Sequence, residues 1–135
     1  MDFKLSTARL DGTGGFLLSV DGELDISTAE QLAKPAATVI RSGRPLVLDL
    51  SMCSFIDSSG LRFVLRIHNA LAVVGKPMVV VTDDAHVRRL FSITAIDLSV
   101  RVVPDLDRAI AWLGEDGAIG EQSNGRSPFP TPAAE

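Results

Sequence analysis

The sequence predicts a single α/β domain: one mixed sheet of four to five strands with about four helices. The first residues alternate polar and apolar around a glycine-rich turn, which is typical of an antiparallel β-hairpin. Two continuous apolar runs follow, Leu46–Leu50 and Met78–Val81, and an amphipathic segment comes after each. Strands that alternate with helices favour parallel pairing through right-handed crossovers, so the sheet is expected to be antiparallel only at its start.

The hairpin strands are expected at residues 3–10 and 15–20, on either side of the turn Asp11–Gly15. Residues 21–25 carry the chain off the second strand. The next segment has helical periodicity, with Ser27 or Thr28 as its cap. This first helix is therefore expected to begin close to the end of the hairpin.

The first helix continues to about Arg41 and ends at Gly43, since glycine is favoured just after a helix. The run Leu46–Leu50 is apolar throughout, which indicates a central strand covered on both faces. A short polar turn is expected after it, and a second helix then extends from about Ser58 to Val74.

In the second half of the chain, Asp83 or Asp84 caps a short helix that ends at Phe91, after the strand Met78–Val81. A last short strand is expected at Val100–Val103, followed by a helix that Asp105 caps and that ends near Gly114. Residues 1–114 would then form the domain. Glycine, serine, proline and asparagine dominate residues 115–135, which predicts a disordered tail.

Composition excludes several classes of function. The formal net charge is −4 and no cluster of basic residues occurs, so no direct contact with nucleic acid is expected. No apolar run is long enough to span a membrane, and the N-terminus lacks the pattern of a secretory signal. The single cysteine, Cys53, favours a cytoplasmic protein without disulfides and is expected to be a buried hydrophobe. His68 and His86 lack suitably spaced carboxylates, so neither a metal nor another cofactor is expected.

The most informative motif is Asp57-Ser58-Ser59-Gly60-Leu61, where the second helix begins. Free N–H groups and the positive end of the helix dipole favour an anion at such a position. A phosphate on one of these serines would be tolerated within the chain and could change what docks on the helix. Serine is also a common helix cap, and Asp57 could equally be the cap, which would leave Ser58 pointing outward.

The second helix has two expected faces. Spacing at 100° per residue places its core face at Gly60, Phe63, Val64, Ile67, Ala70, Leu71 and Val74. Leu61 and Leu65 lie on a shoulder of the opposite, polar stripe. That shoulder is either a patch for a partner protein or is covered by the domain's own loops. The candidate partner-binding residues are Leu61, Arg62, Leu65, Arg66, Asn69 and Val73.

Four segments together resemble the STAS domain, and within it the bacterial anti-sigma factor antagonists. They are Gly22–Asp25, Leu46–Leu50, Phe55–Leu61 and Val87–Phe91. The resemblance covers roughly residues 3–114 in the same order of elements, and therefore implies the STAS fold.

The resemblance implies a cytoplasmic binding protein, a monomer when free, rather than an enzyme. Such an antagonist binds an anti-sigma factor, often also a serine kinase, and so frees the sigma factor for transcription. The kinase then phosphorylates the antagonist and the complex dissociates, and a PP2C-type phosphatase restores the binding form. In this sequence the phosphoacceptor would be Ser58, supported by Asp25, Asp57, Ser59 and Gly60. Many relatives have glycine where this chain has Arg62.

Three other functions compete with this one. A serine hydrolase would need a base and an oxyanion site, and no Gly-x-Ser-x-Gly motif surrounds Ser58. A response-regulator receiver could use Asp49 as phosphoacceptor, but it would also need a lysine late in the chain, and none follows Lys76. A STAS domain that acts as a non-phosphorylated scaffold keeps the fold and loses only the switch.

Overall fold

The computed structural model describes the backbone of residues 3–122 and the side chains of residues 3–114. Its five strands form one sheet in the order β1-β2-β3-β4-β5, in which β1 and β2 are antiparallel and the other pairs parallel. This confirms the predicted mixed sheet and its four helices. The strands are β1 (Lys4–Leu10), β2 (Gly15–Leu24), β3 (Leu46–Ile56), β4 (Met78–Val81) and β5 (Arg101–Val103).

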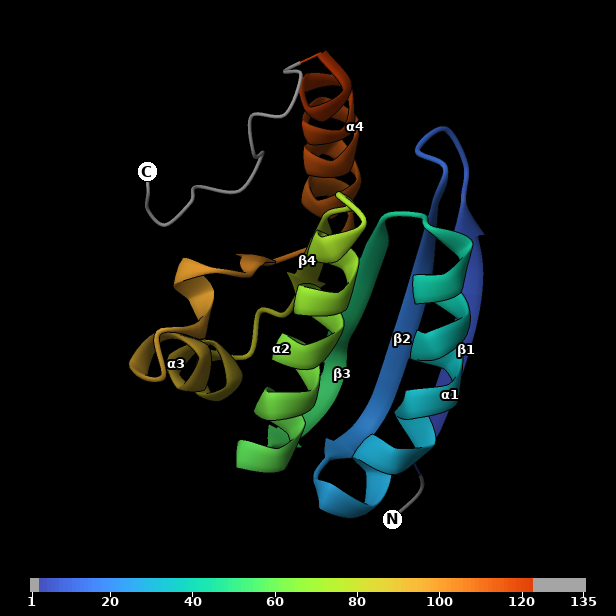
Figure 1. Ribbon diagram of the computed structural model, residues 1–135. Coiled ribbons are helices and arrows are strands. Elements are labelled where there is room, and N and C mark those ends of the chain that lie inside the picture. The colour runs from blue at the N-terminus through green and yellow to red at the C-terminus, as the bar shows by residue number, and fades with distance from the viewer. Residues whose placement is uncertain (1–2, 123–135) are drawn as a thin grey trace.

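Three of the helices lie on one face of the sheet. They are α1 (Ile26–Ser42), α2 (Ser58–Val73) and α3 (Ala85–Ile93). Figure 1 shows α1 and α2 side by side in front of β2 and β3. Because the strands follow one another in a single direction and each parallel crossover is right-handed, the connecting helices all fall on the same side. Their apolar faces meet the alternate residues Leu46, Leu48 and Leu50 of β3 in the main core.

The fourth helix, α4 (Leu106–Gln122), covers the other face. Ala109 and Leu113 of α4 pack there against Val47 of β3 and against Val79 and Val81 of β4 in a second, smaller core. The central strands are thus buried on both faces, as their continuous apolar sequences predict.

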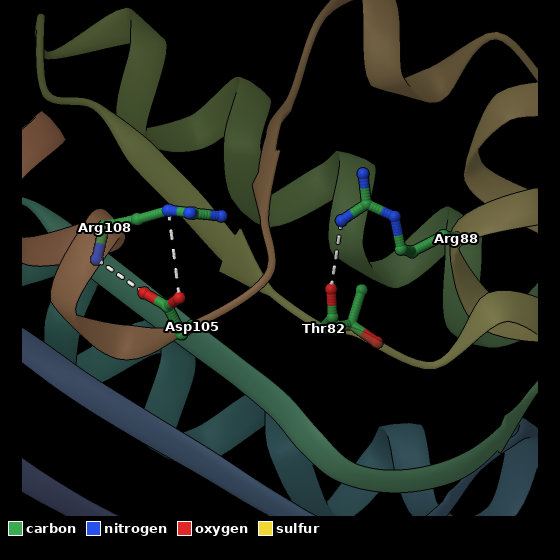
Figure 2. Close-up of polar contacts among 4 residues, drawn as sticks. All are labelled: Thr82, Arg88, Asp105 and Arg108. Carbon is green, nitrogen blue, oxygen red and sulfur yellow. Dashed lines mark hydrogen bonds and ion pairs between the residues drawn. The ribbon is translucent and has the colours of Figure 1, made fainter.

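Polar contacts fix the starts of α3 and α4 (Figure 2). The Arg88 guanidinium donates a hydrogen bond to the carbonyl of Thr82, at 3.2 Å, just beyond the end of β4. Asp105 accepts a hydrogen bond from the backbone N–H of Arg108 at 2.8 Å, and so acts as the cap predicted for the last helix.

The last helix is longer than predicted. The sequence places its end near Gly114, whereas α4 continues to Gln122. Gly114 does not take the left-handed conformation with which glycine ends a helix, as Gly43 does after α1 with φ 68°. The helix therefore passes through Gly114. Residues 123–135, the greater part of the predicted tail, lie outside the described residues.

The central strand is also longer than predicted. A turn is expected after Leu50, but β3 continues to Ile56 because β2 continues to Leu24 beside it. The two strands stay paired to the register Leu24–Ile56, with irregularities between Ser19 and Asp21 and between Gly22 and Glu23. Pairing with β2 thus keeps residues 51–56 extended beyond the apolar run that predicts the strand.

Candidate functional site

Two turns lie next to each other where β2 and β3 end. Leu24 pairs with Ile56, and the N–H of Asp57 donates to the carbonyl of Leu24 at 3.2 Å. Gly60, in the first turn of α2, packs directly on this backbone: a Cβ at residue 60 would lie 2.5 Å from the Leu24 carbonyl oxygen. Glycine at this position therefore lets the start of α2 approach the end of β2.

Asp57, and not Ser58, caps α2. The Asp57 carboxylate accepts a hydrogen bond from the N–H of Gly60 at 3.0 Å, and the Asp57 carbonyl accepts one from the N–H of Leu61 at 2.9 Å. Ser58 is the first residue of the helix and is exposed, and its hydroxyl makes no hydrogen bond to any of the described residues. Of the two arrangements that the sequence allows, the structure has the one in which the serine points outward. A modifying enzyme can therefore reach the Ser58 hydroxyl from solvent.

The neighbouring turn is held by Asp25, which caps α1 in place of the predicted Ser27 or Thr28. One Asp25 oxygen accepts hydrogen bonds from the Ser27 hydroxyl at 2.8 Å and from the N–H of Thr28 at 3.1 Å. The Thr28 hydroxyl in turn accepts from the N–H of Asp25 at 2.8 Å. Extended backbone at Asp25 makes it the cap, with Thr28 in the reciprocal position of the capping box. The hydrogen bonds that the Asp25 carboxylate accepts, that of the Ser27 hydroxyl first, lower the pKa of this carboxyl.

The core face of α2 differs from the predicted one. Leu61, expected at the partner surface, is only 6% exposed and belongs to the main core, and His68 is also 6% exposed. Val74, expected in the core, is 50% exposed. The close approach of Gly60 to β2 sets the rotation of the helix, and this rotation turns Leu61 inward. Leu61 is therefore not available to a partner at the surface, and the domain itself covers this part of the shoulder.

The polar stripe of α2 is exposed as predicted. It consists of Ser58, Arg62, Arg66, Asn69 and Val73, and the last of these is 85% exposed. Leu65 lies at its border, half-buried against the main core. Ser59 is half-buried and faces α1 across a small groove. The structure thus brings the candidate phosphoacceptor and four of the candidate partner-binding residues onto one exposed surface.

Sequence reasoning missed three exposed apolar side chains, one in the first residue of α1 and two in the part of β3 that precedes α2. Ile26 is 69% exposed, Met52 is 66% exposed and Phe55 is 41% exposed. Ile26 directly follows the cap of α1, and Phe55 comes two residues before the cap of α2. Alternation along the strand gives no signal for Phe55, because it would place Phe55 on the same face as the buried Cys53. The register shift between β2 and β3 at Ser54 breaks that alternation.

Two further titratable groups are buried in the described part of the chain. Burial raises the pKa of the Cys53 thiol, whose sulfur lies 3.2 Å from the carbonyl oxygen of Phe55. Burial also lowers the pKa of His68. Both shifts favour the neutral side chain, and Cys53 is the buried hydrophobe that its sequence context predicts.

Among the residues with described side chains, no three His, Cys, Asp or Glu residues gather closely enough to hold a metal ion. No helix within residues 3–122 has both the length and the apolar character needed to cross a membrane.

Comparison of the sequence with protein families gives a match to the STAS domain over residues 5–109. The chain is 35% identical over 109 residues to a protein named as a candidate anti-sigma factor antagonist, BtrV of Bordetella bronchiseptica. That match covers 80% of this chain and 91% of BtrV.

Solved structures with the same fold include an anti-sigma factor antagonist from Mycobacterium paratuberculosis. It has 28% sequence identity and a TM-score of 0.71, over 82% of this chain and 94% of that one. The phosphorylated form of the Bacillus cell fate determinant SpoIIAA has 22% identity and a TM-score of 0.61, over 82% and 97% of the two chains. At 22% identity, the similarity to SpoIIAA shows a shared fold only.

Proposed function

The chain belongs to the STAS domain family, and we propose that it acts as an anti-sigma factor antagonist controlled by phosphorylation of Ser58. In its unmodified form it binds an anti-sigma factor that is also a serine kinase, and so releases the sigma factor. Phosphorylation of Ser58 by that kinase ends the interaction, and a PP2C-type phosphatase restores it. The chain itself catalyses no reaction.

The observation that carries this proposal is the division of roles between two adjacent residues. Asp57 supplies the cap that α2 needs, so the exposed Ser58 hydroxyl has no part in holding the helix. A phosphate can therefore be added without loss of a structural hydrogen bond. At the first position of the helix it would also lie near free N–H groups, which stabilise an anion.

The surface around Ser58 suits a protein partner. Exposed apolar side chains that contribute nothing to the core are typical of interaction surfaces. Two of them lie near the start of α2: Ile26, the first residue of α1, lines the same groove as Ser59, and Phe55 lies at the end of β3, three residues before Ser58. The relatives BtrV and the Mycobacterium protein are both named for antagonism of anti-sigma factors. A phosphorylated form is known for SpoIIAA, which has the same fold.

A phosphate can switch this surface without refolding the domain. It replaces a neutral hydroxyl with about −1.5 to −2 charges and three oxygen atoms. If repulsion and steric exclusion together cost about 3 kcal/mol, binding weakens roughly a hundredfold. Local repulsion at the start of α2 is therefore sufficient.

The test compares Ser58→Ala and Ser58→Glu as baits in native extract, with Ser92→Glu, at an exposed serine of α3, as a matched control. The Ser58→Ala and Ser92→Glu baits are expected to capture a kinase-type anti-sigma factor, identified by mass spectrometry. The Ser58→Glu bait is expected not to capture it. Titration calorimetry with the purified partner then measures the affinities. Equal binding by Ser58→Ala and Ser58→Glu would contradict the switch.

A second measurement separates the switch from a scaffold. The captured kinase is incubated with ATP and this protein, and the modified residue is mapped by mass spectrometry. We expect phosphate on Ser58. A partner that binds but leaves Ser58 unmodified, both in this reaction and in the native protein, would instead identify a non-phosphorylated STAS scaffold. Incubation with acetyl phosphate and magnesium is expected to leave Asp49 unlabelled.

A further inference from the structure

A groove of about 220 Å³ lies between α1 and α2, next to the candidate phosphoacceptor. Its apolar part is formed by Ile26 and Ala33 of α1 and by Phe63 of α2. Its charged part is formed by Arg62 and Arg66, which are exposed on α2. The groove therefore combines an apolar strip with a basic rim.

The two arginines have no carboxylate partner among the side chains that the structure describes. Within the described side chains, the ion pair that forms is that between Arg108 and Asp105, 3.9 Å apart at the start of α4 and away from the groove residues in the sequence. Arg62 and Arg66 are four residues apart on one helix, so their like charges face each other. Glu30, across the groove on α1, supplies one negative charge against these two positive ones. The rim has an excess of positive charge that an acidic ligand would neutralise.

The groove is continuous with the proposed switch. Ser59 lines its end, and Ser58 is the preceding residue on the same first turn of α2. A phosphate on Ser58 would therefore add negative charge at the mouth of a groove whose rim is positive. The same modification would repel an acidic ligand and attract the arginines that hold it.

We propose that this groove receives an acidic amphipathic segment of the anti-sigma factor, with an apolar side chain between α1 and α2 and carboxylates on Arg62 and Arg66. The proposal rests on the proposed function and names the chemistry of the partner at that site. It also gives phosphorylation a second effect, since phosphoserine competes with the partner's carboxylates for the same two arginines.

The first test neutralises the rim. Arg62→Gln and Arg66→Gln are titrated against the purified anti-sigma factor that the Ser58→Ala bait captures, with Arg89→Gln, at an exposed arginine of α3, as control. Each groove variant is expected to bind about tenfold more weakly, the strength of a charge-assisted hydrogen bond. Both are also expected to show a weaker dependence of affinity on salt. The control should bind like the parent protein.

The second test uses the sign of a new charge at one position. Ala33 is an exposed helical residue in the groove, where Glu and Lys are both good helix formers of similar length. Both side chains fill the groove to a similar extent, so their difference measures charge alone: Ala33→Glu is expected to bind about tenfold more weakly than Ala33→Lys. Two losses of equal size would indicate steric contact without recognition of charge, and would overturn the proposal. Tighter binding by Ala33→Glu would indicate a basic ligand, and would also overturn it.

Failure of this inference differs from failure of the proposed function. If the partner binds in a way that depends on Ser58 while all the groove variants bind like the parent, docking occurs elsewhere and the switch stands. If no anti-sigma factor binds Ser58→Ala, both proposals fail. Sedimentation measures whether the chain associates with itself. If it does, and if the Ala33 variants change that association, the groove binds a second copy of this chain and the proposal of an acidic segment is overturned.

Discussion

At the scale of single residues, the site depends on how Asp57 and Ser58 share the start of α2. Asp57 is tied to the backbone by its hydrogen bond with the N–H of Gly60, and Ser58 is left at the surface. A residue that maintains the fold thus lies beside one that can change charge without disturbing it. This arrangement lets a modification act on binding and leave stability nearly unchanged.

The cap at Asp57 can be removed by substitution. Asp57→Ala leaves the N–H of Gly60 without its acceptor, so the free energy of unfolding is expected to fall by about 1 kcal/mol. Asp57→Asn keeps an oxygen that can accept the same bond and should lose much less. Urea denaturation followed by circular dichroism measures both values. Equal losses in the two variants would show that the carboxylate charge matters and the cap does not.

His68 predicts a dependence of stability on pH. Burial lowers the pKa of His68 in the folded state, so the unfolded state binds the proton more tightly. As the pH falls, the unfolded state begins to take up this proton near the ordinary histidine pKa of about 6.5. The stability that comes from neutral His68 is complete above that pH, and is lost as the pH falls toward the lower pKa of the folded state.

We therefore expect His68→Gln to lose less stability than the parent when the pH is lowered from 7.5 to 5.5. His86→Gln, at an exposed histidine of α3, is the matched control and should follow the parent. Urea denaturation at several pH values measures the difference. Identical pH profiles for the parent and His68→Gln would contradict the assignment.

At the scale of elements, the position of α2 is set by a close contact of backbone with backbone. A Cβ at residue 60 would lie 2.5 Å from the Leu24 carbonyl oxygen and 2.8 Å from Cγ1 of Ile56. Glycine at this position fixes the distance between the start of α2 and the end of β2, and with it the rotation of α2. The groove, the buried Leu61 and the exposed arginines all follow from that rotation.

Alanine substitutions at two helical glycines test this contact. Gly60→Ala is expected to destabilise the fold by about 1–3 kcal/mol through overpacking, although alanine favours helix. Gly114→Ala, in α4, meets open space and is expected to stabilise by about 0.5–1 kcal/mol. The opposite signs should appear in thermal denaturation. Stabilisation by Gly60→Ala would show that the start of α2 lies further from the end of β2 than described.

At the scale of the whole molecule, one sheet joins two cores. The larger core holds α1, α2 and α3 on one face, and the smaller one holds α4 on the other. Strands β3 and β4 contribute to both, through Leu48 and Val80 on one side and Val47 and Val79 on the other. Disruption of either core should therefore unfold the whole domain.

The single tryptophan reports on this coupling. Trp112 packs in the smaller core, with the Arg101 guanidinium 5.3 Å from the centre of its ring. Tryptophan fluorescence thus follows α4, while far-ultraviolet circular dichroism follows all the helices. For one cooperative domain the two unfolding curves should coincide.

Leu113→Ala is expected to lower the free energy of unfolding by about 2–5 kcal/mol, because Leu113 is buried in the smaller core. Both unfolding curves should then shift together. Ala111→Gln, at an exposed position of α4, serves as control. If only the fluorescence transition moves, α4 docks as a separate unit and the prediction is wrong.

The sequence by itself determined the features that depend on near neighbours. Apolar periodicity placed the five strands and four helices, and the motif around Asp57 placed Ser58 at the start of a helix. Capping and periodicity act over a few residues, so they are visible in one short segment.

Only the tertiary structure decided where burial departs from the local pattern. It extended β3 to Ile56 through pairing with β2, turned Leu61 and His68 into the core, and placed α4 on the opposite face. It also formed the groove between α1 and α2, to which the two helices contribute residues about thirty positions apart. Burial depends on which distant segments meet an element, and local periodicity carries no information on that.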